Sequence, residues 1–368
     1  MKFQFVKLLL QNPLVRSFRT LWKKLTAGWK VHLEKPVPEE VLADSREGAS
    51  IPSFSFFFLL SAASVIATLG LIANSTAVII GAMIVAPLMN PILSMAFAIV
   101  TANWTLYKRS LVTVTLGAAT TILISFLISY GLPIDVVGSE VVARTTPNLL
   151  DLGIAIAAGA AGSFSLTRKS IASSIAGVAI AVALVPPLCV TGMGLGIGGE
   201  LEAQIGSAVI TNFDVSAGSF LLFIVNLAGI TFTACLVFLS QSYGNLYKAF
   251  QTILIWLLII AVLCGPLTGS MREFVVANRI ALEIRGIREE KSEISQLTQI
   301  RHIDVRLEGS TAYVSILGSA PQGVVTDEYL KSSEKRIFDT ISKMGVESMN
   351  MKIRIYPVEI KEYQNIID

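Results

Sequence analysis

The hydrophobic residues of this chain fall into long runs that short polar links separate. Seven apolar segments are predicted, over residues 52–73, 76–100, 110–131, 149–165, 171–197, 215–240 and 250–267. No charged residue occurs between Glu47 and Lys108, a gap of about 60 residues, whereas a helix needs about 20 apolar residues to cross a bilayer. The pattern predicts a polytopic α-helical membrane protein with about seven spans.

Composition agrees with this prediction. The 368 residues are 53% hydrophobic and only 15% charged, whereas an ordinary soluble domain is about 25% charged. The first 50 residues are too polar for a cleavable signal peptide, so we expect the first span to direct insertion. Cys189, Cys235 and Cys264 all lie in apolar segments, which favours small buried hydrophobes over a disulfide framework or a metal site.

The charges of the links predict an orientation in the cell membrane. Links 102–109 and 166–170 are basic, link 198–204 is acidic, and the N-terminal region 1–50 is basic like the first two. The positive-inside rule therefore places the N-terminus in the cytoplasm. Seven crossings then place the C-terminal region outside the cytoplasm. Residues 204–218 could be a re-entrant piece or part of an additional short span, and one extra crossing would reverse that side.

The N-terminal region contains an amphipathic pattern. Apolar residues recur at helical spacing from Leu14 to Trp29, and basic residues share the opposite face. Such a helix could lie on an anionic membrane surface or pack on the cytoplasmic side of the protein itself, and the pattern fits both. Either way, it offers surface for a homo-oligomer, whose number the sequence does not give.

The C-terminal residues 270–368 are predicted to form a separate soluble α+β domain. A helix over 276–299, two strands joined by a turn at Gly309 and Ser310, a helix over 322–344 and a last strand give the order α-β-β-α-β. Basic and acidic residues nearly balance in this region, which argues against a nucleic-acid surface. Its presence also favours a sensor, because a bare transporter needs no such domain.

Two stretches in the second and fifth apolar segments resemble each other. "GAMIVAPLMNP" (81–91) and "GVAIAVALVPP" (177–187) each begin with glycine, end with proline ten positions later and contain a second proline shortly before. An offset of three spans reverses the direction of the chain, so the similarity predicts an inverted repeat, as in many secondary transporters. The alternative is that two proline-containing spans look alike by composition.

Prolines in the middle of a span predict broken helices. A proline donates no backbone hydrogen bond and its ring presses on the preceding turn, so such a break persists in a membrane only where protein encloses it or water reaches it. Half-helix ends and freed carbonyls can then bind an ion or polar solute. For two matching breaks we favour a site over simple kinks.

The candidate site residues are these prolines and the scarce polar groups within or beside the apolar segments: Asn74, Ser75, Thr76, Pro87, Asn90, Pro91, Asp151, Pro186, Pro187, Thr191, Asn212, Asp214 and Asn226. Asp151 and Asp214 could carry a cation or a proton, although a helix cap explains both. Asn226 could bond a neighbouring helix. Small residues in the fourth segment, such as Ala155 and Gly159, predict close helix packing in the middle of the bundle.

Residues 74–93 and 151–196 resemble a known family. "NSTAVIIGAMIVAPLMNPIL" and the segment ending "AGVAIAVALVPPLCVTGMGLG" are similar to the bacterial and archaeal membrane proteins catalogued as domain of unknown function three-eight-nine. The resemblance covers roughly residues 60–240 and implies a polytopic membrane protein without implying an activity. Asn90 stands where relatives often have glycine, which makes the amide a feature of this chain.

These observations favour a transporter or channel for a small polar solute or ion, with its site at the broken second and fifth spans. The alternative is an envelope sensor or scaffold whose C-terminal domain binds a ligand or partner. An intramembrane enzyme is disfavoured, because no catalytic or nucleotide-binding motif occurs and both histidines lie outside the spans. We expect no cofactor and no metal site. With no basic residue inside a span, a cation is favoured slightly over an anion.

Overall fold

The fold is described from a computed structural model for residues 35–132, 136–169, 184–197, 200–203, 209–290, 299–321 and 323–357. The helix predicted around Leu14–Trp29, the first part of the fifth apolar segment and residues 204–208 of the suspected re-entrant piece lie outside these ranges.

A bundle of helices fills the first three quarters of the chain. Its helices are α3 (Glu39–Ala49), α4 (Phe54–Ile72), α5 (Thr76–Val85), α6 (Met89–Thr101), α7 (Trp104–Tyr130), α8 (Ser139–Val142), α9 (Leu149–Leu166), α11 (Val185–Gly196), α12 (Asn212–Ser240) and α13 (Leu246–Glu290). Among the described residues, five helices are long and apolar enough to cross a membrane, or six if the bent pair α5 and α6 is one span. The apolar α11 is the described part of the fifth segment.

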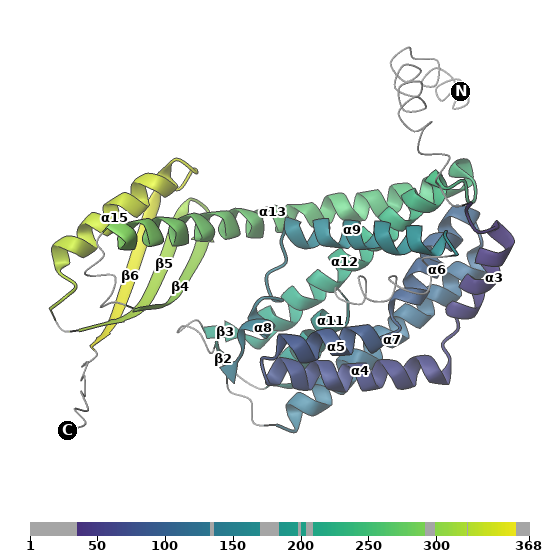
Figure 1. The fold of residues 1–368 in the computed structure, drawn as a ribbon, viewed down its shortest axis with the longest axis horizontal. Coiled ribbons are helices and arrows are strands. Elements are labelled where there is room, and N and C mark those ends of the chain that lie inside the picture. Colours follow the sequence, from purple (N-terminus) through teal and green to yellow (C-terminus); the bar gives the residue numbers. More distant parts are fainter. Residues whose placement is uncertain are drawn as a thin grey trace, which may run out of the picture.

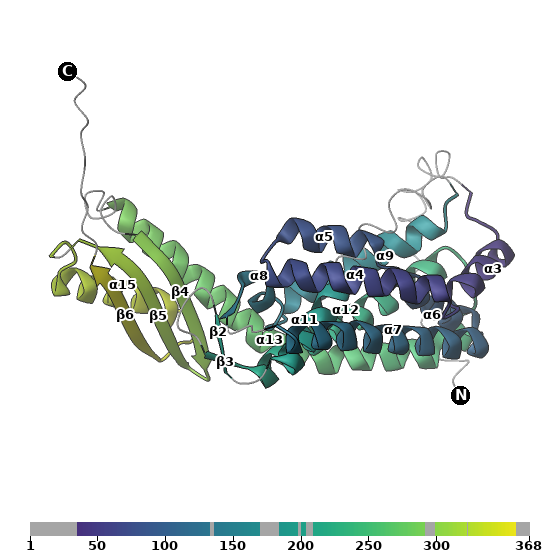
Figure 2. The same cartoon turned by 90° about the horizontal axis from the view of Figure 1, so that it is seen from below.

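The helices run side by side, and the two ends of the bundle differ (Figures 1 and 2). Helix α3 lies at one end (Figure 1), which we call the basic end because Arg109 in the first turns of α7 bonds the Glu47 carbonyl of α3 there, and Arg168 follows Thr167, whose carbonyl accepts a bond from Val37 N. At the opposite end, β1 (Val136–Val137), β2 (Glu200–Ala203) and β3 (Val209–Thr211) form a small sheet in the order β1-β2-β3. The C-terminal domain lies beyond that opposite end (Figure 1).

Polar caps place the starts of the long helices. The Ser53 hydroxyl accepts a bond from Phe56 N at the start of α4, and the Asn103 amide oxygen accepts one from Leu106 N at the start of α7. Helix α9 begins with a reciprocal capping box between Asn148 and Asp151. Each cap satisfies a backbone N–H that has no partner within its own helix.

The centre of the bundle is formed by α6, α11 and α12. Nearly every side chain of α6 and α11 is buried, and 61% of the apolar window of α12 is buried, against 6% for α13. Gly159 of α9 would place a Cβ 2.8 Å from the Ile230 backbone of α12, which confirms the predicted close packing. The prediction that α9 lies in the middle is wrong, because Ile154 and Ile156 on its other face are exposed.

The C-terminal domain is a three-stranded sheet covered by two helices, as the order α-β-β-α-β predicts. Strands β4 (Gln299–Glu308) and β5 (Thr311–Ala320) are antiparallel around Gly309, whose φ is 64°, and β6 (Ser348–Pro357) runs parallel to β5 after α15 (Asp327–Ser342). The first covering helix is the end of α13. This helix runs 45 residues without a break, about 67 Å, so the predicted boundary near residue 269 falls inside it.

Candidate functional site

The second span is broken where the sequence places Pro87. Helix α5 ends at Val85, α6 begins at Met89, and the two axes differ by 52°. Because α5 contains 10 residues, the break lies about 15 Å from the start of the span, near the middle of a hydrocarbon core of about 30 Å. Asn90 is exposed at this break, whereas Pro91 is buried.

The fifth span has an equivalent helix start. Helix α11 begins at Val185, after Leu184, with Pro186 and Pro187 in its first turn. Both prolines are buried. Helix α6 begins eight residues after Gly81, and α11 begins eight residues after Gly177, so the two starts have the same register relative to the repeated glycine.

The prolines have a different role from the one that the sequence suggested. Pro91, Pro186 and Pro187 do not interrupt a helix but stand in the first turn of a new one. The first N–H groups of a helix have no partner within it, and a proline at such a position removes a donor that hydrocarbon could not satisfy. The feature at the break after α5 and at the start of α11 is therefore a helix N-terminus, which favours negative charge.

The two half-helices approach the middle from opposite ends. Helix α6 packs between α7 and α12 and ends at the basic end, while α11 packs between the same two helices and ends at the opposite end. Their N-termini therefore both face the interior of the bundle.

Helix α11 is held by close contacts with both neighbours. The Thr191 hydroxyl lies 3.0 Å from the Ser219 hydroxyl of α12, and the Ser216 hydroxyl donates to the Thr191 carbonyl. On the other side, a Cβ on Gly192 would lie 2.8 Å from Ser125 Cβ and 3.0 Å from Phe126 N of α7. Thr191 is therefore engaged in helix packing.

Asn74, Ser75 and Thr76 lie away from the breaks. Asn74 and Ser75 precede α5 and Thr76 is its first residue, at the opposite end of the bundle, and Asn74 has a φ of 50°. The Asn74 amide oxygen accepts a bond from Glu140 N at 3.0 Å, and the Thr76 hydroxyl donates to the Glu140 carboxylate at 2.6 Å. These side chains thus fasten α5 to the segment around α8.

Of the remaining candidate residues, Asp151 caps α9, and the other three lie in α12. The Asp151 carboxylate accepts a bond from Asn148 N at 2.8 Å, which is the capping alternative. Asn226 is 4% exposed within α12. Asn212 and Asp214 lie in the first turn of α12, and their side chains are outside what the structure describes. No cluster of three potential metal-ligating side chains occurs among the described residues.

Sequence reasoning missed a row of hydroxyl groups between α4 and α7. The Ser64 hydroxyl donates to Thr121 at 3.1 Å, and the Thr68 and Ser125 hydroxyls lie 2.6 Å apart. The sequence spacing could have revealed this row, because small or hydroxyl residues recur every fourth position of α7 from Thr113 to Ser129. Such bonds join helices within a bilayer.

Comparison with known proteins supports the membrane architecture. Residues 83–232 match the family described as "Domain of unknown function (DUF389)", a range that contains all of α6, α7, α9 and α11. The chain is also 30% identical over 211 residues to an uncharacterized protein of Methanocaldococcus jannaschii. That match covers 57% of this chain and 61% of the relative.

These comparisons confirm the predicted resemblance for residues 83–232. Together with the apolar helices, they identify a multi-pass membrane protein. Neither printed description names an activity.

Proposed function

We propose that this protein is a transporter or channel for a small polar solute or ion. The site is the interior region onto which the N-termini of α6 and α11 open. The observation that supports it is the matching start of the two half-helices, eight residues after the repeated glycine and between the same pair of helices.

An inverted repeat explains the arrangement. In this proposal α4 corresponds to α9, and α7 corresponds to α12. Between them, the pair α5 and α6 corresponds to the fifth span, whose second part is α11. Contacts agree, since α4 packs on α7 as α9 packs on α12, and α6 and α11 each contact both α7 and α12. Strands β2 and β3 are then an insertion between α11 and α12. The complete protein would have seven spans, with α3 and the C-terminal domain on opposite sides of the membrane.

Flux through proteoliposomes tests this function. The purified protein is expected to increase the flux of at least one member of a panel of monovalent ions, protons and small polar solutes. Asn90→Ala should reduce that flux, because Asn90 is the exposed polar side chain at the start of α6. Thr115→Ala is the matched control, because Thr115 is exposed on α7 and its hydroxyl donates to the Leu111 carbonyl of its own helix.

The results separate the alternatives clearly. Flux that falls in Asn90→Ala and persists in Thr115→Ala supports a site at the break. Equal flux in both variants would show that the pathway does not pass the start of α6. An absence of flux for every member of the panel contradicts the proposal.

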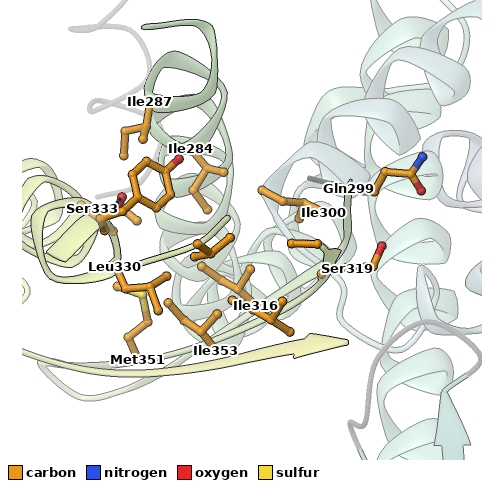
Figure 3. Close-up of a pocket in the computed structure, with 16 residues that line it drawn as sticks. Ile284, Ile287, Gln299, Ile300, Ile316, Ser319, Leu330, Ser333, Met351 and Ile353 are labelled. Carbon is orange, nitrogen blue, oxygen red and sulfur yellow. Dashed lines mark hydrogen bonds between the residues drawn. The ribbon is translucent and has the colours of Figure 1, made fainter. Parts of the chain in front are cut away.

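A ligand-binding sensor is the second candidate, and one pocket favours it. The C-terminal domain contains a pocket of about 90 Å³ between the end of α13, the sheet and α15. Figure 3 shows Ile284 from α13, Ile316 and Ile353 from the sheet and Ser333 from α15 around it. The largely apolar lining fits a small apolar group, because a cavity of about 150 Å³ holds one benzene.

Native mass spectrometry of the full chain tests this second candidate. A small apolar molecule that copurifies with the native chain should be lost in Ser333→Trp, whose side chain would fill the pocket. Asn74→Ala changes a residue of the helical bundle that does not line the pocket, so this variant should retain the molecule. A native chain that carries no such molecule, or equal retention in both variants, would count against the sensor.

A further inference from the structure

Arg46 is a buried arginine whose side chain is largely without hydrogen bonds. It lies in the last turn of α3 and is only 5% exposed. Its Nη2 donates to the Ser45 hydroxyl at 3.1 Å, but its Nε and Nη1 have no hydrogen-bond partner in the described part of the chain. The ion pairs found among the described residues do not include it either.

The other buried arginine shows what a structural role requires. Arg168 is also 5% exposed. Its Nη1 donates to the Thr167 carbonyl and hydroxyl, its Nη2 donates to Gln241 Oε1 at 2.7 Å, and its guanidinium lies 4.8 Å from the centre of the Phe164 ring. Arg168 thus joins the end of α9 to the link after α12, and Arg46 makes no comparable set of bonds.

Capping of α3 does not account for Arg46. An arginine in a last turn often bonds the final carbonyls of its helix, but the Glu47 carbonyl already accepts bonds from the Ser50 hydroxyl at 2.7 Å and from Arg109 Nη2 at 3.0 Å. Burial lowers the pKa of Arg46 to about 10, so the side chain is still charged at neutral pH. A buried charge without a partner is strongly unfavourable.

Arg46 stands next to the first turns of α6. The Ser94 hydroxyl of α6 donates to the Arg46 carbonyl at 2.9 Å and lies 3.0 Å from the Asn90 carbonyl. The backbone of Arg46 therefore contacts α6 five residues after its start at Met89, about 7.5 Å along the helix, a distance that an extended arginine side chain can span. Sequence alone does not indicate this proximity, because α3 precedes the first span and belongs to the polar N-terminal region.

We propose that Arg46 binds a small anion, and that the solute of the α6 and α11 site is therefore anionic. The donors of the Arg46 guanidinium supply a charge and directed hydrogen bonds, which suit a carboxylate, phosphate or similar oxyanion. The N-termini of the half-helices favour the same sign of charge. The anion site stands on Arg46 alone, whereas the assignment of an anionic solute rests on the proposed transport function. That assignment reverses the slight preference for a cation that the sequence suggested.

Anion-dependent stability of the full chain tests the binding site. The native protein in lipid-free neutral detergent should unfold at a higher temperature as inorganic phosphate replaces gluconate at constant ionic strength. At a phosphate concentration of about 100 times the dissociation constant, the unfolding equilibrium constant falls about 100-fold. Arg46→Met should unfold at a higher temperature than the native protein without phosphate, and it should lose the phosphate response.

Arg168→Met is the matched control. It should lower the unfolding temperature, because it leaves Gln241 and Thr167 without their partner, and it should keep the phosphate response. A phosphate response that persists in Arg46→Met overturns the proposal. So does a variant that is much less stable than the native protein without phosphate, because Arg46 would then have a structural partner.

Two further measurements separate the source of the anion and the role in transport. A stabilisation by phosphatidylglycerol micelles with none by phosphate or acetate would identify a lipid headgroup as the anion and overturn the solute assignment. In proteoliposomes, anion flux that Arg46→Met abolishes supports the assignment, and cation flux that is unchanged in Arg46→Met overturns it while the transport function stands. Phosphate binding without any flux would support the anion site and contradict the transport function.

Discussion

Replacement of Gly192 by alanine should separate α11 from α7 and destabilise the bundle. The new Cβ would lie 2.8 Å from Ser125 Cβ and 3.0 Å from Phe126 N, and it would also overlap the Ile122 carbonyl oxygen. Carbon atoms in contact prefer about 3.5–4.0 Å, so α11 must move away by close to 1 Å. Backbone atoms form part of the obstacle and cannot rotate aside as a side chain could.

The size of this effect follows from two opposing contributions. Overpacking of a well-packed core costs about 1–3 kcal/mol, and contact with backbone places this site near the upper value. Alanine is a better helix former than glycine by about 1 kcal/mol. We therefore expect Gly192→Ala to lower the free energy of unfolding by about 2 kcal/mol, which raises the unfolding equilibrium constant about 30-fold.

Gly153→Ala on α9 is the matched control. No atom lies within 4 Å of the Cβ that it would add, so only the helix preference of up to about 1 kcal/mol remains, with a stabilising sign. The unfolding of both variants is to be compared in mixed dodecyl sulfate micelles by tryptophan fluorescence. Equal stabilities for the two variants would refute the packing of α11 against α7.

Two other contacts give predictions of different kinds. The hydrogen bond from Thr76 and the Arg144 guanidinium lower the pKa of Glu140 below its ordinary value. These contacts should therefore stabilise the folded protein fully above the ordinary glutamate pKa of about 4.3. The stabilisation should disappear as the pH falls through the lowered pKa. Unfolding measured against pH should therefore show a smaller acid-dependent loss in Glu140→Gln than in the native protein, and identical profiles would contradict the contact. A double-mutant cycle between Thr68 and Ser125 should give a coupling of about 0.6 kcal/mol, and a coupling of zero would show that their 2.6 Å contact does not stabilise the bundle.

The sequence predicted the local features of this fold well, because they depend on local chemistry. Apolar runs located the helices, and the paired prolines located the starts of α6 and α11. Glycine at Gly309 and alternating residues located the hairpin of the C-terminal domain. The long helix α13 was divided in two because its composition changes near Gly269, whereas helical hydrogen bonds continue through both kinds of residue.

The features that the sequence missed depend on contacts between distant segments. Arg46 is charged and stands in a polar region, and only its packing beside Ser94 of α6 buries it. Helix α9 has small residues that pack on α12, but the exposure of Ile154 and Ile156 on its other face depends on how the helices are arranged, which its sequence does not show.

Aqueous access to the start of α6 tests the central claim that the half-helix break opens to a polar pathway. Asn90→Cys should be made in a background with Cys264→Ser, because Cys189 and Cys235 are buried. A charged, membrane-impermeant thiol reagent is then applied to proteoliposomes. Ile84→Cys is the control, because Ile84 is 53% exposed on apolar α5 and is expected to face lipid. We predict that Asn90→Cys reacts and Ile84→Cys does not, since the reaction needs a thiolate in water. Equal reactivity at both positions, or none at Asn90→Cys, would contradict the account.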